Sequence, residues 1–131
     1  MSRPVHFEIH AEDVQRALAF YTAVFGWEVQ DWSEYAGVPY FGVMTGNQEQ
    51  PGINGAIMQR GADAPEVGVP VMGCVITMQV EDLDGVSAKV LEAGGAVAVE
   101  KHAMPGMAWQ AYFRDTENNV FGVHQPDPDA A

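Results

Sequence analysis

Residues 12–26 read EDVQRALAFYTAVFG, and residues 81–95 read EDLDGVSAKVLEAGG. Each stretch opens on Glu-Asp, continues as an amphipathic run and closes on glycine, with the same offset of 69 residues at both ends (82 − 13 and 95 − 26). An apolar stretch typical of a strand precedes each run. The pattern predicts a duplicated module, and a cleft between two such halves is the default position for a ligand.

The first module is expected to have the order βαβββ. Val5–His10 alternates apolar and polar residues, which is typical of a strand with two unlike faces, one of them carrying His6, Glu8 and His10. The helix is expected from about Asp13, a suitable N-cap, to Val24, and Gly26 ends it. Its buried stripe is expected to be Val14, Leu18, Tyr21 and Phe25. Strands follow at residues 27–32, 38–44 and 53–59, with glycine-containing turns between them.

The second module repeats that order. Strands are expected at residues 74–79, 96–100, 108–114 and 120–124, with a helix at residues 83–93. Residues 102–107 are interpreted as a mobile loop of the kind that closes over a ligand. Module one is placed at about 4–60, a linker at 61–71, module two at about 72–126 and a loose acidic tail at 127–131, all within a single domain of 131 residues.

Composition excludes several functions. The 18 acidic and 6 basic residues give a net charge of −12, which repels nucleic acids and anionic membranes. No apolar run reaches the roughly 18 residues that cross a bilayer, and no secretory leader is recognisable, so a cytoplasmic protein is expected. The single cysteine, Cys74, is interpreted as a small buried apolar residue. Exposed sheet edges favour a homodimer.

Two phrases carry a family resemblance. Residues 20–27 read FYTAVFGW at the end of the first helix, and residues 113–123 read FRDTENNVFGV before and within the last strand. With the two βαβββ modules, they resemble the vicinal oxygen chelate superfamily, which includes glyoxalases, bleomycin-resistance proteins, fosfomycin-modifying enzymes and extradiol dioxygenases. The resemblance covers about residues 5–125. It implies an α+β fold in which the two tandem modules form a cup-shaped mixed sheet.

The resemblance also implies where a metal would be held. Enzymes of the superfamily place His or Gln early in the first strand of a module and Glu in the last strand. His6 matches this pattern, but Val75 and Gly122 occupy the corresponding places in the second module, and residues 54–57 offer no carboxylate or imidazole. Because a catalytic ion needs about three protein ligands, no cofactor is expected at the usual position. A displaced divalent-metal site at His6, Glu8 and His124 remains the alternative.

Polar and aromatic side chains on the expected inner faces are the candidate ligand-binding residues. They are His6, Glu8, His10, Tyr40, Trp109 and His124. Glu8 stands in the middle of a strand, where a carboxylate needs a partner; it is expected to pair with a histidine, to bind a cationic ligand or to act as a general base. The aromatic residues suit a planar or hydrophobic molecule.

Two functions follow from this pattern. The first is a small-molecule-binding protein that lacks the usual metal site and takes a cationic or aromatic ligand. The alternative is a metal-dependent lyase, isomerase or dioxygenase that uses the shifted His/Glu site. The sequence leaves open whether the chain is an enzyme, and elemental analysis of protein purified without chelator would discriminate the two.

Overall fold

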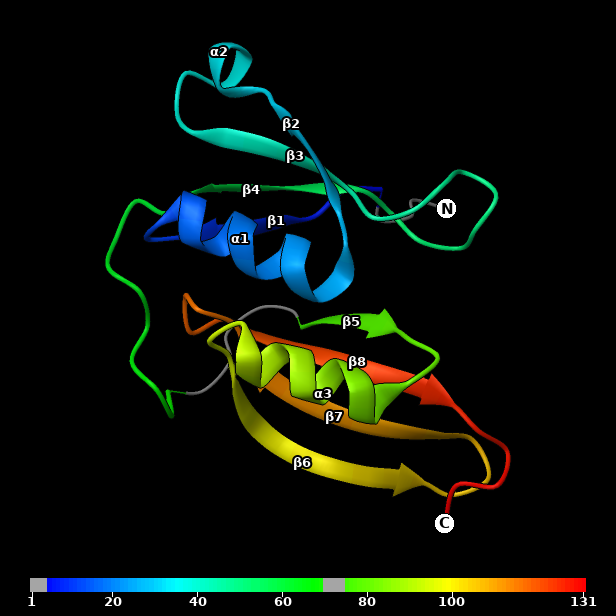
Figure 1. Ribbon diagram of the computed structural model, residues 1–131. Coiled ribbons are helices and arrows are strands. Elements are labelled where there is room, and N and C mark those ends of the chain that lie inside the picture. Colours follow the sequence, from blue (N-terminus) through cyan, green and yellow to red (C-terminus); the bar gives the residue numbers. More distant parts are fainter. Residues whose placement is uncertain (1–4, 70–74) are drawn as a thin grey trace. The chain divides into compact units, whose positions relative to one another are not determined.

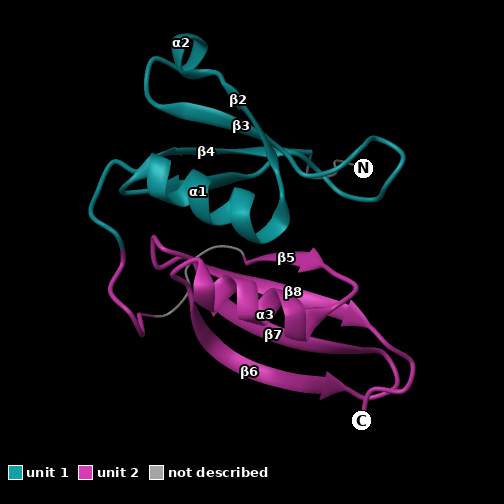
Figure 2. Cartoon of the chain, in the orientation of Figure 1, with its two compact units in different colours: residues 1–64 teal, residues 65–131 magenta. Residues whose placement is uncertain are grey.

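The computed structural model describes residues 5–69 and 75–131. The chain divides into two compact units, residues 1–64 and residues 65–131 (Figure 2). Cys74 and the end of the expected linker, residues 70–71, lie outside the described residues. None of the helices in the described ranges is long and apolar enough to cross a membrane.

Unit 1 is a four-stranded mixed sheet with a helix on one face (Figure 1). Its elements are β1 (Glu8–Ala11), α1 (Val14–Phe25), β2 (Glu28–Asp31), α2 (Ser33–Ala36), β3 (Tyr40–Met44) and β4 (Gly55–Gln59). The strand order is β1-β4-β3-β2, in which β1 and β4 are parallel and the other neighbours are antiparallel. Helix α1 packs against β1 and β4.

Unit 2 repeats this topology. Its elements are β5 (Ile76–Gln79), α3 (Leu83–Glu92), β6 (Ala96–Met104), β7 (Ala108–Arg114) and β8 (Val120–Pro126). The order is β5-β8-β7-β6, again with one parallel pair, β5 and β8, at the edge. The α+β fold class and the duplicated module that the sequence predicts are therefore confirmed.

The Glu-Asp pairs begin both helices. Asp13 Oδ1 accepts a 3.0 Å hydrogen bond from the backbone N–H of Arg16, and Asp82 Oδ1 accepts an equal one from Gly85. Both bonds satisfy a helix N–H that has no partner within the helix. Gly26 ends α1 in the left-handed region at φ 72°, where a side chain would be strained.

The core of unit 1 lies between α1 and the sheet. The ring of Trp27 stacks on that of Tyr21, with centroids 5.0 Å apart and planes 7° apart. Phe7 contacts Trp27 from the strand side at a centroid distance of 5.8 Å. Because side chains alternate along β1, burial of Ile9 and Ala11 toward α1 turns Glu8 and His10 to the other face of the sheet. That face carries the candidate site.

Two local expectations between the strands were wrong. The four-residue helix α2 stands between β2 and β3, where only a turn was expected. Strand β6 extends to Met104, so residues 102–104 form part of the sheet, paired with β7, and only residues 105–107 form the turn. This pairing gives the backbone of the expected loop regular hydrogen-bond partners.

The C-terminal residues are also more ordered than expected. Strand β8 continues through Gln125 and Pro126. Beyond it, the N–H of Gly106 donates to the carbonyl of Ala130 at 2.9 Å, and Ala130 is only 3% exposed. The acidic segment is therefore folded back onto the turn between β6 and β7.

Candidate functional site

Four of the six candidate residues lie together on the sheet face of unit 1 that points away from α1, here called the polar face. On β1, Ile9 is 6% exposed and Ala11 is fully buried, whereas Glu8 and His10 are exposed. The register through β4 places Tyr40 on the same face as His10. His6 joins them through a hydrogen bond to Tyr40.

These side chains form a chain of hydrogen bonds that ends on a carboxylate. Tyr40 Oη donates to Glu8 Oε2 at 2.8 Å, and His6 Nε2 lies 2.8 Å from Tyr40 Oη. Because Tyr40 directs its proton toward Glu8, His6 Nε2 is the donor in the second bond. His10 Nε2 approaches the other oxygen, Glu8 Oε1, at 3.4 Å. Both oxygens of Glu8 thus face hydrogen-bond donors, and the Glu8 side chain is still 41% exposed.

The two titratable groups at the centre of this chain have shifted pKa values. The hydrogen bond from Tyr40 lowers the pKa of Glu8 below its ordinary value of 4.5, with smaller lowering effects from His10 and His6, and burial opposes the shift. Burial raises the pKa of Tyr40 above 10.0, and the adjacent Glu8 carboxylate raises it further. The site therefore holds an ionised carboxylate beside a neutral phenol at neutral pH.

Trp32 adds a flat apolar surface to the polar face. It immediately precedes α2, and its ring lies over Gly42 of β3 next to the ring of Tyr40. Trp32 is not among the six candidate residues, although it belongs to the aromatic residues of module one that suit a planar ligand. The available signal was Gly42 itself, since an isolated glycine inside a strand marks the close approach of another group.

The other two candidates belong to unit 2 and face opposite sides of its sheet. His124 Nδ1 donates a 2.8 Å hydrogen bond to Gln110 Oε1, and these two residues are register partners on β8 and β7. Trp109, one residue before Gln110, points to the α3 side. Its indole Nε1 donates to Asp127 at 3.0 Å, and Lys101 Nζ, which also pairs with Asp84 of α3, lies 4.7 Å from its ring centroid.

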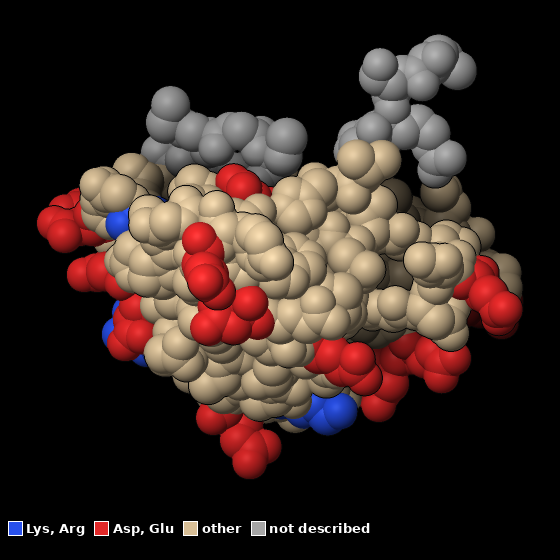
Figure 3. All heavy atoms as spheres, turned by 90° about the horizontal axis from the view of Figure 1, so that it is seen from above, with Lys and Arg blue, Asp and Glu red and all other residues tan. Residues whose placement is uncertain are grey.

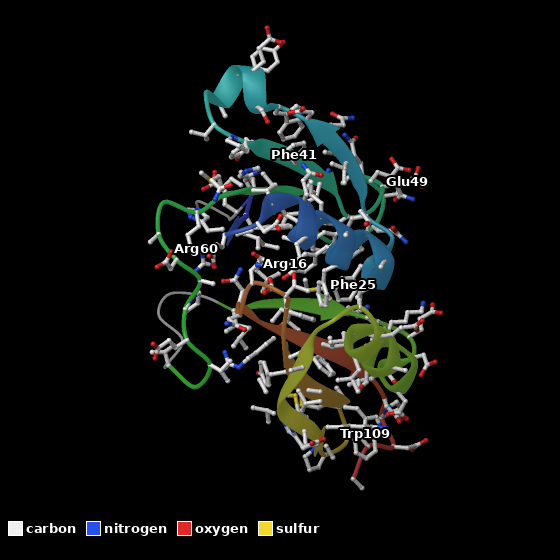
Figure 4. The ribbon with its side chains drawn as sticks, turned by 60° about the vertical axis from the view of Figure 1, so that its left-hand side comes forward. Arg16, Phe25, Phe41, Glu49, Arg60 and Trp109 are labelled. Carbon is white, nitrogen blue, oxygen red and sulfur yellow. The ribbon has the colours of Figure 1, made fainter. Side chains whose placement is uncertain are left out.

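Trp109, labelled in Figure 4, therefore lies on the opposite face of the unit 2 sheet from His124. Both were chosen as candidates for lining a cavity, Trp109 at its rim, but the two side chains do not share a sheet face, because neighbouring residues of a strand alternate. Gln110, which the sequence analysis overlooked, occupies the face in its place. It is a buried polar residue at 6% exposure and holds His124.

The residues at the superfamily's metal positions do not fit a metal. Gly122 and Val75 have no donor side chain. A Cβ at position 122 would stand 2.7 Å from Thr77 Oγ1 and 3.1 Å from Gln110 Nε2, so neighbouring side chains fill the space where a ligand would project. Within residues 5–69 and 75–131, no three His, Cys, Asp or Glu side chains form a group that could hold an ion. Of the alternative set, His6 and Glu8 belong to unit 1 and His124 to unit 2.

A separate hollow of about 630 Å³ lies at the start of α1. The residues that line it are Glu12, Asp13, Val14, Gln15, Arg16, Ser33, Pro39, Phe41 and Gln59. Phe41 and Gln59 alternate with Tyr40 and Met58, so this hollow lies on the α1 side of the sheet and not on the polar face. Figure 4 shows Phe41 and Arg16 in unit 1.

Comparison with solved structures identifies the fold. A mutant of the fosfomycin resistance protein FosX from Listeria monocytogenes, in complex with Mn(II) and a dihydroxypropylphosphonic acid, superposes with a TM-score of 0.74. The two chains share 16% identity, and the match covers 97% of this chain and 94% of FosX. A glyoxylase/bleomycin resistance protein/dioxygenase domain from Frankia sp. EAN1pec gives a TM-score of 0.74 at 17% identity, with 97% and 93% covered. The chain therefore has the fold of these glyoxalase/bleomycin resistance/dioxygenase proteins.

Sequence comparisons point to the same group of proteins. Residues 3–39 match the family described as "Bleomycin resistance protein-like N-terminal". A Mycobacterium tuberculosis protein named "Putative glyoxylase CFP32" is 31% identical over 121 residues, which cover 92% of this chain and 43% of that protein. This chain therefore spans less than half the length of the curated relative. The resemblance that the sequence analysis reported is confirmed.

Proposed function

We propose that this vicinal oxygen chelate protein binds a small organic cation on the polar face of unit 1, with Glu8 as the countercharge and without a metal at the superfamily's usual position. The observation that carries the proposal is the Glu8 carboxylate, which Tyr40 orients through a 2.8 Å hydrogen bond while 41% of its side chain stays exposed. A fixed and accessible carboxylate is suited to form a charge pair with a cationic ligand.

The charge of the chain supports a cationic ligand. The net charge is −12, and Asp and Glu side chains are spread over the face in Figure 3, where Lys and Arg are few. The field of such a surface raises the local concentration of cations and disfavours anions. Among residues 5–69 and 75–131, the Coulombic effects on the pKa of Glu8 come from His10 and His6 and from no lysine or arginine.

The pKa directions favour binding over proton transfer. A general acid or base works best when its pKa lies near the working pH. The pKa of Glu8 is lowered and that of Tyr40 is raised, so both groups move away from neutrality. Glu8 is then a weak base and Tyr40 a weak acid, which suits a binding site with a constant charge.

The second candidate function is a metal-dependent lyase, isomerase or dioxygenase. It draws support from the Mn(II) in the FosX complex and from His6, which matches one ligand position of the superfamily. Elemental analysis of protein purified without chelator separates the candidates. A transition metal at one equivalent per chain that disappears in His6→Ala would favour the enzyme.

Calorimetric titration with two flat bicyclic probes tests the cation proposal. N-methylquinolinium carries a permanent charge, whereas quinoline is neutral near neutral pH. Glu8→Gln is expected to weaken the binding of N-methylquinolinium by about fivefold, which corresponds to about 1 kcal/mol for a partly exposed charge pair. The affinity for quinoline should stay unchanged. Glu92→Gln, an exposed charge change in α3, is the matched control. Equal losses for both probes would show that Glu8 only supports the fold.

A further inference from the structure

Gly42 provides the space that Trp32 occupies on the polar face. A Cβ built at position 42 would lie 2.5, 2.5 and 2.6 Å from Trp32 Cη2, Cζ3 and Cζ2. A point almost equally distant from three atoms of a six-membered ring lies near the axis through the ring centre. The Trp32 ring therefore lies face-down on Gly42, and its other face points away from the sheet.

The backbone on either side of Trp32 is fixed by hydrogen bonds. The Trp32 N–H donates to the Tyr40 carbonyl at 2.9 Å, and the Ser33 N–H donates to Asp31 Oδ1 at 2.9 Å. Ser33 Oγ in turn accepts a 3.0 Å hydrogen bond from the Tyr40 N–H. The ring is held in place before any ligand arrives, which lowers the entropic cost of using it for binding.

The rings of Trp32, Tyr40 and His6 lie side by side along the polar face. Trp32 and Tyr40 have centroids 6.4 Å apart and planes 23° apart, and the values for Tyr40 and His6 are 6.5 Å and 14°. Residues two apart in a strand, such as Tyr40 and Gly42, are separated by about 6.6 Å. This distance matches the 6.4 Å between the centroids of Tyr40 and of Trp32, which lies over Gly42. Three near-parallel rings thus line this face of the sheet and make up its floor.

Glu8 borders this floor at a distance that one small molecule can span. In the register, Glu8 of β1 pairs with Ala56 of β4, and Ala56 pairs with Gly42 of β3. Two strand spacings amount to about 9.6 Å, and Ala56 between them projects only a methyl group. A bicyclic ligand on the Trp32 ring would therefore reach the carboxylate of Glu8.

We infer that Trp32 is the stacking platform of the cation site, that Gly42 sets its position, and that the ligand is a flat, π-bearing organic cation. This inference rests on the proposed function, because the charge of the ligand is assigned to Glu8. Trp32 then determines the shape of the ligand, and Glu8 determines its charge. Indole is the aromatic surface that attracts cations most strongly, and stacking adds contact area that only a flat ligand offers.

Two cations of equal charge and different shape test the platform. N-methylquinolinium is flat and aromatic, and N-methylquinuclidinium is globular and aliphatic; each is titrated into the full chain by calorimetry. The unchanged protein is expected to prefer the flat cation, and Trp32→Leu is expected to reduce that preference by about fivefold or more, the lower end of the value of aromatic stacking. Tyr35→Leu, which removes an exposed aromatic ring from the same segment, is the matched control and should retain the preference.

Gly42→Ala tests the positioning role while Trp32 is still present. The added methyl group displaces the ring, so the preference for the flat cation should fall as in Trp32→Leu. In the Trp32→Leu background, Gly42→Ala should cost much less stability than in the unchanged protein, since the ring that it meets is gone. This comparison decides the point even if Gly42→Ala alone folds poorly.

Each outcome of these titrations is decisive. If the preference for the flat cation survives Trp32→Leu, Trp32 is not the stacking platform. The cation site itself is still supported if Glu8→Gln weakens the binding of both cations. A preference that survives Gly42→Ala shows that Gly42 does not set the ring position. If the unchanged protein binds neither cation, the platform and the proposed function are both excluded.

Discussion

Tyr40 on β3 holds Glu8 on β1 across the intervening strand β4, with 2.8 Å between the phenol oxygen and Glu8 Oε2. The same phenol oxygen accepts from His6 Nε2 at 2.8 Å. One hydroxyl group therefore determines the orientation of the carboxylate and the tautomer of the neighbouring histidine when that histidine is neutral. The geometry makes Tyr40 the residue whose removal should change the site most without changing its charge.

Tyr40→Phe is expected to raise the pKa of Glu8 toward its ordinary value. The hydrogen bond from Tyr40 is the largest influence that lowers the pKa of this carboxyl, and phenylalanine keeps the ring but not the donor. The measurement is an NMR titration of the side-chain carboxyl carbons. Tyr35→Phe, at the exposed end of the same segment, should leave the Glu8 titration unchanged. An unshifted Glu8 in Tyr40→Phe would contradict the hydrogen bond.

The stability contribution of Glu8 is expected to depend on pH in one direction. The pKa of Glu8 is lower in the folded chain than its ordinary value of 4.5, so folding favours the ionised form. That contribution is fully present above about pH 5, where both states are ionised, and it is lost as the pH falls through the folded pKa. Glu8→Gln should therefore be less stable than the unchanged protein near neutral pH, and the difference should shrink in acid.

Urea unfolding at neutral pH and at about pH 3 measures this difference. Glu92→Gln provides the control, because it removes an exposed charge from α3 without touching the hydrogen-bond chain. A difference between Glu8→Gln and the unchanged protein that stays constant with pH would mean that the lost interaction does not involve the ionised carboxylate.

The fold was predictable because its signals are local and occur twice. Asp13 and Asp82 each cap a helix, and both helices follow a strand in the same order. Four-residue α2 lacks such a signal, because one turn is too short to show a helical period. Strand β6 was cut short for a different reason. Glu100, Lys101 and His102 are polar, and only the partner strand β7 keeps them extended.

Only those features of the candidate site that depend on a single strand could be predicted from the sequence. His6, Glu8 and His10 share a face by alternation within β1, and Tyr40 was chosen for its chemistry. Whether Trp109 and His124 share a sheet face depends on the register between β7 and β8. The sequence does not show this register. The role of Trp32 depends on Gly42, ten residues away. The contact between the Trp32 ring and Gly42 is visible only in the three-dimensional structure.

Gly122→Glu is expected to destabilise unit 2 and not to create a metal site. Even the first carbon of the new side chain would lie 2.7 Å from Thr77 Oγ1, and the Gln110 amide is close on the same side. Such crowding typically costs about 1–3 kcal/mol. Thermal unfolding with and without Mn(II) or Zn(II) is the measurement, and Gly122→Ala isolates the contribution of the first carbon. Stabilisation of Gly122→Glu by either ion would overturn this expectation.

Asp127→Ala is expected to loosen the C-terminal segment from the turn between β6 and β7. The Asp127 carboxylate accepts a 3.0 Å hydrogen bond from Trp109 Nε1 and a 2.9 Å bond from the Asp129 N–H. Loss of a charged acceptor from a partly buried indole N–H costs about 1–2 kcal/mol. Asp129→Ala removes the same charge but leaves the Trp109 bond, so its cost should be close to zero. Hydrogen exchange of the Gly106 N–H, which donates to Ala130, should accelerate only in Asp127→Ala. Equal exchange in the two variants would show that the carboxylate of Asp127 does not hold this segment in place.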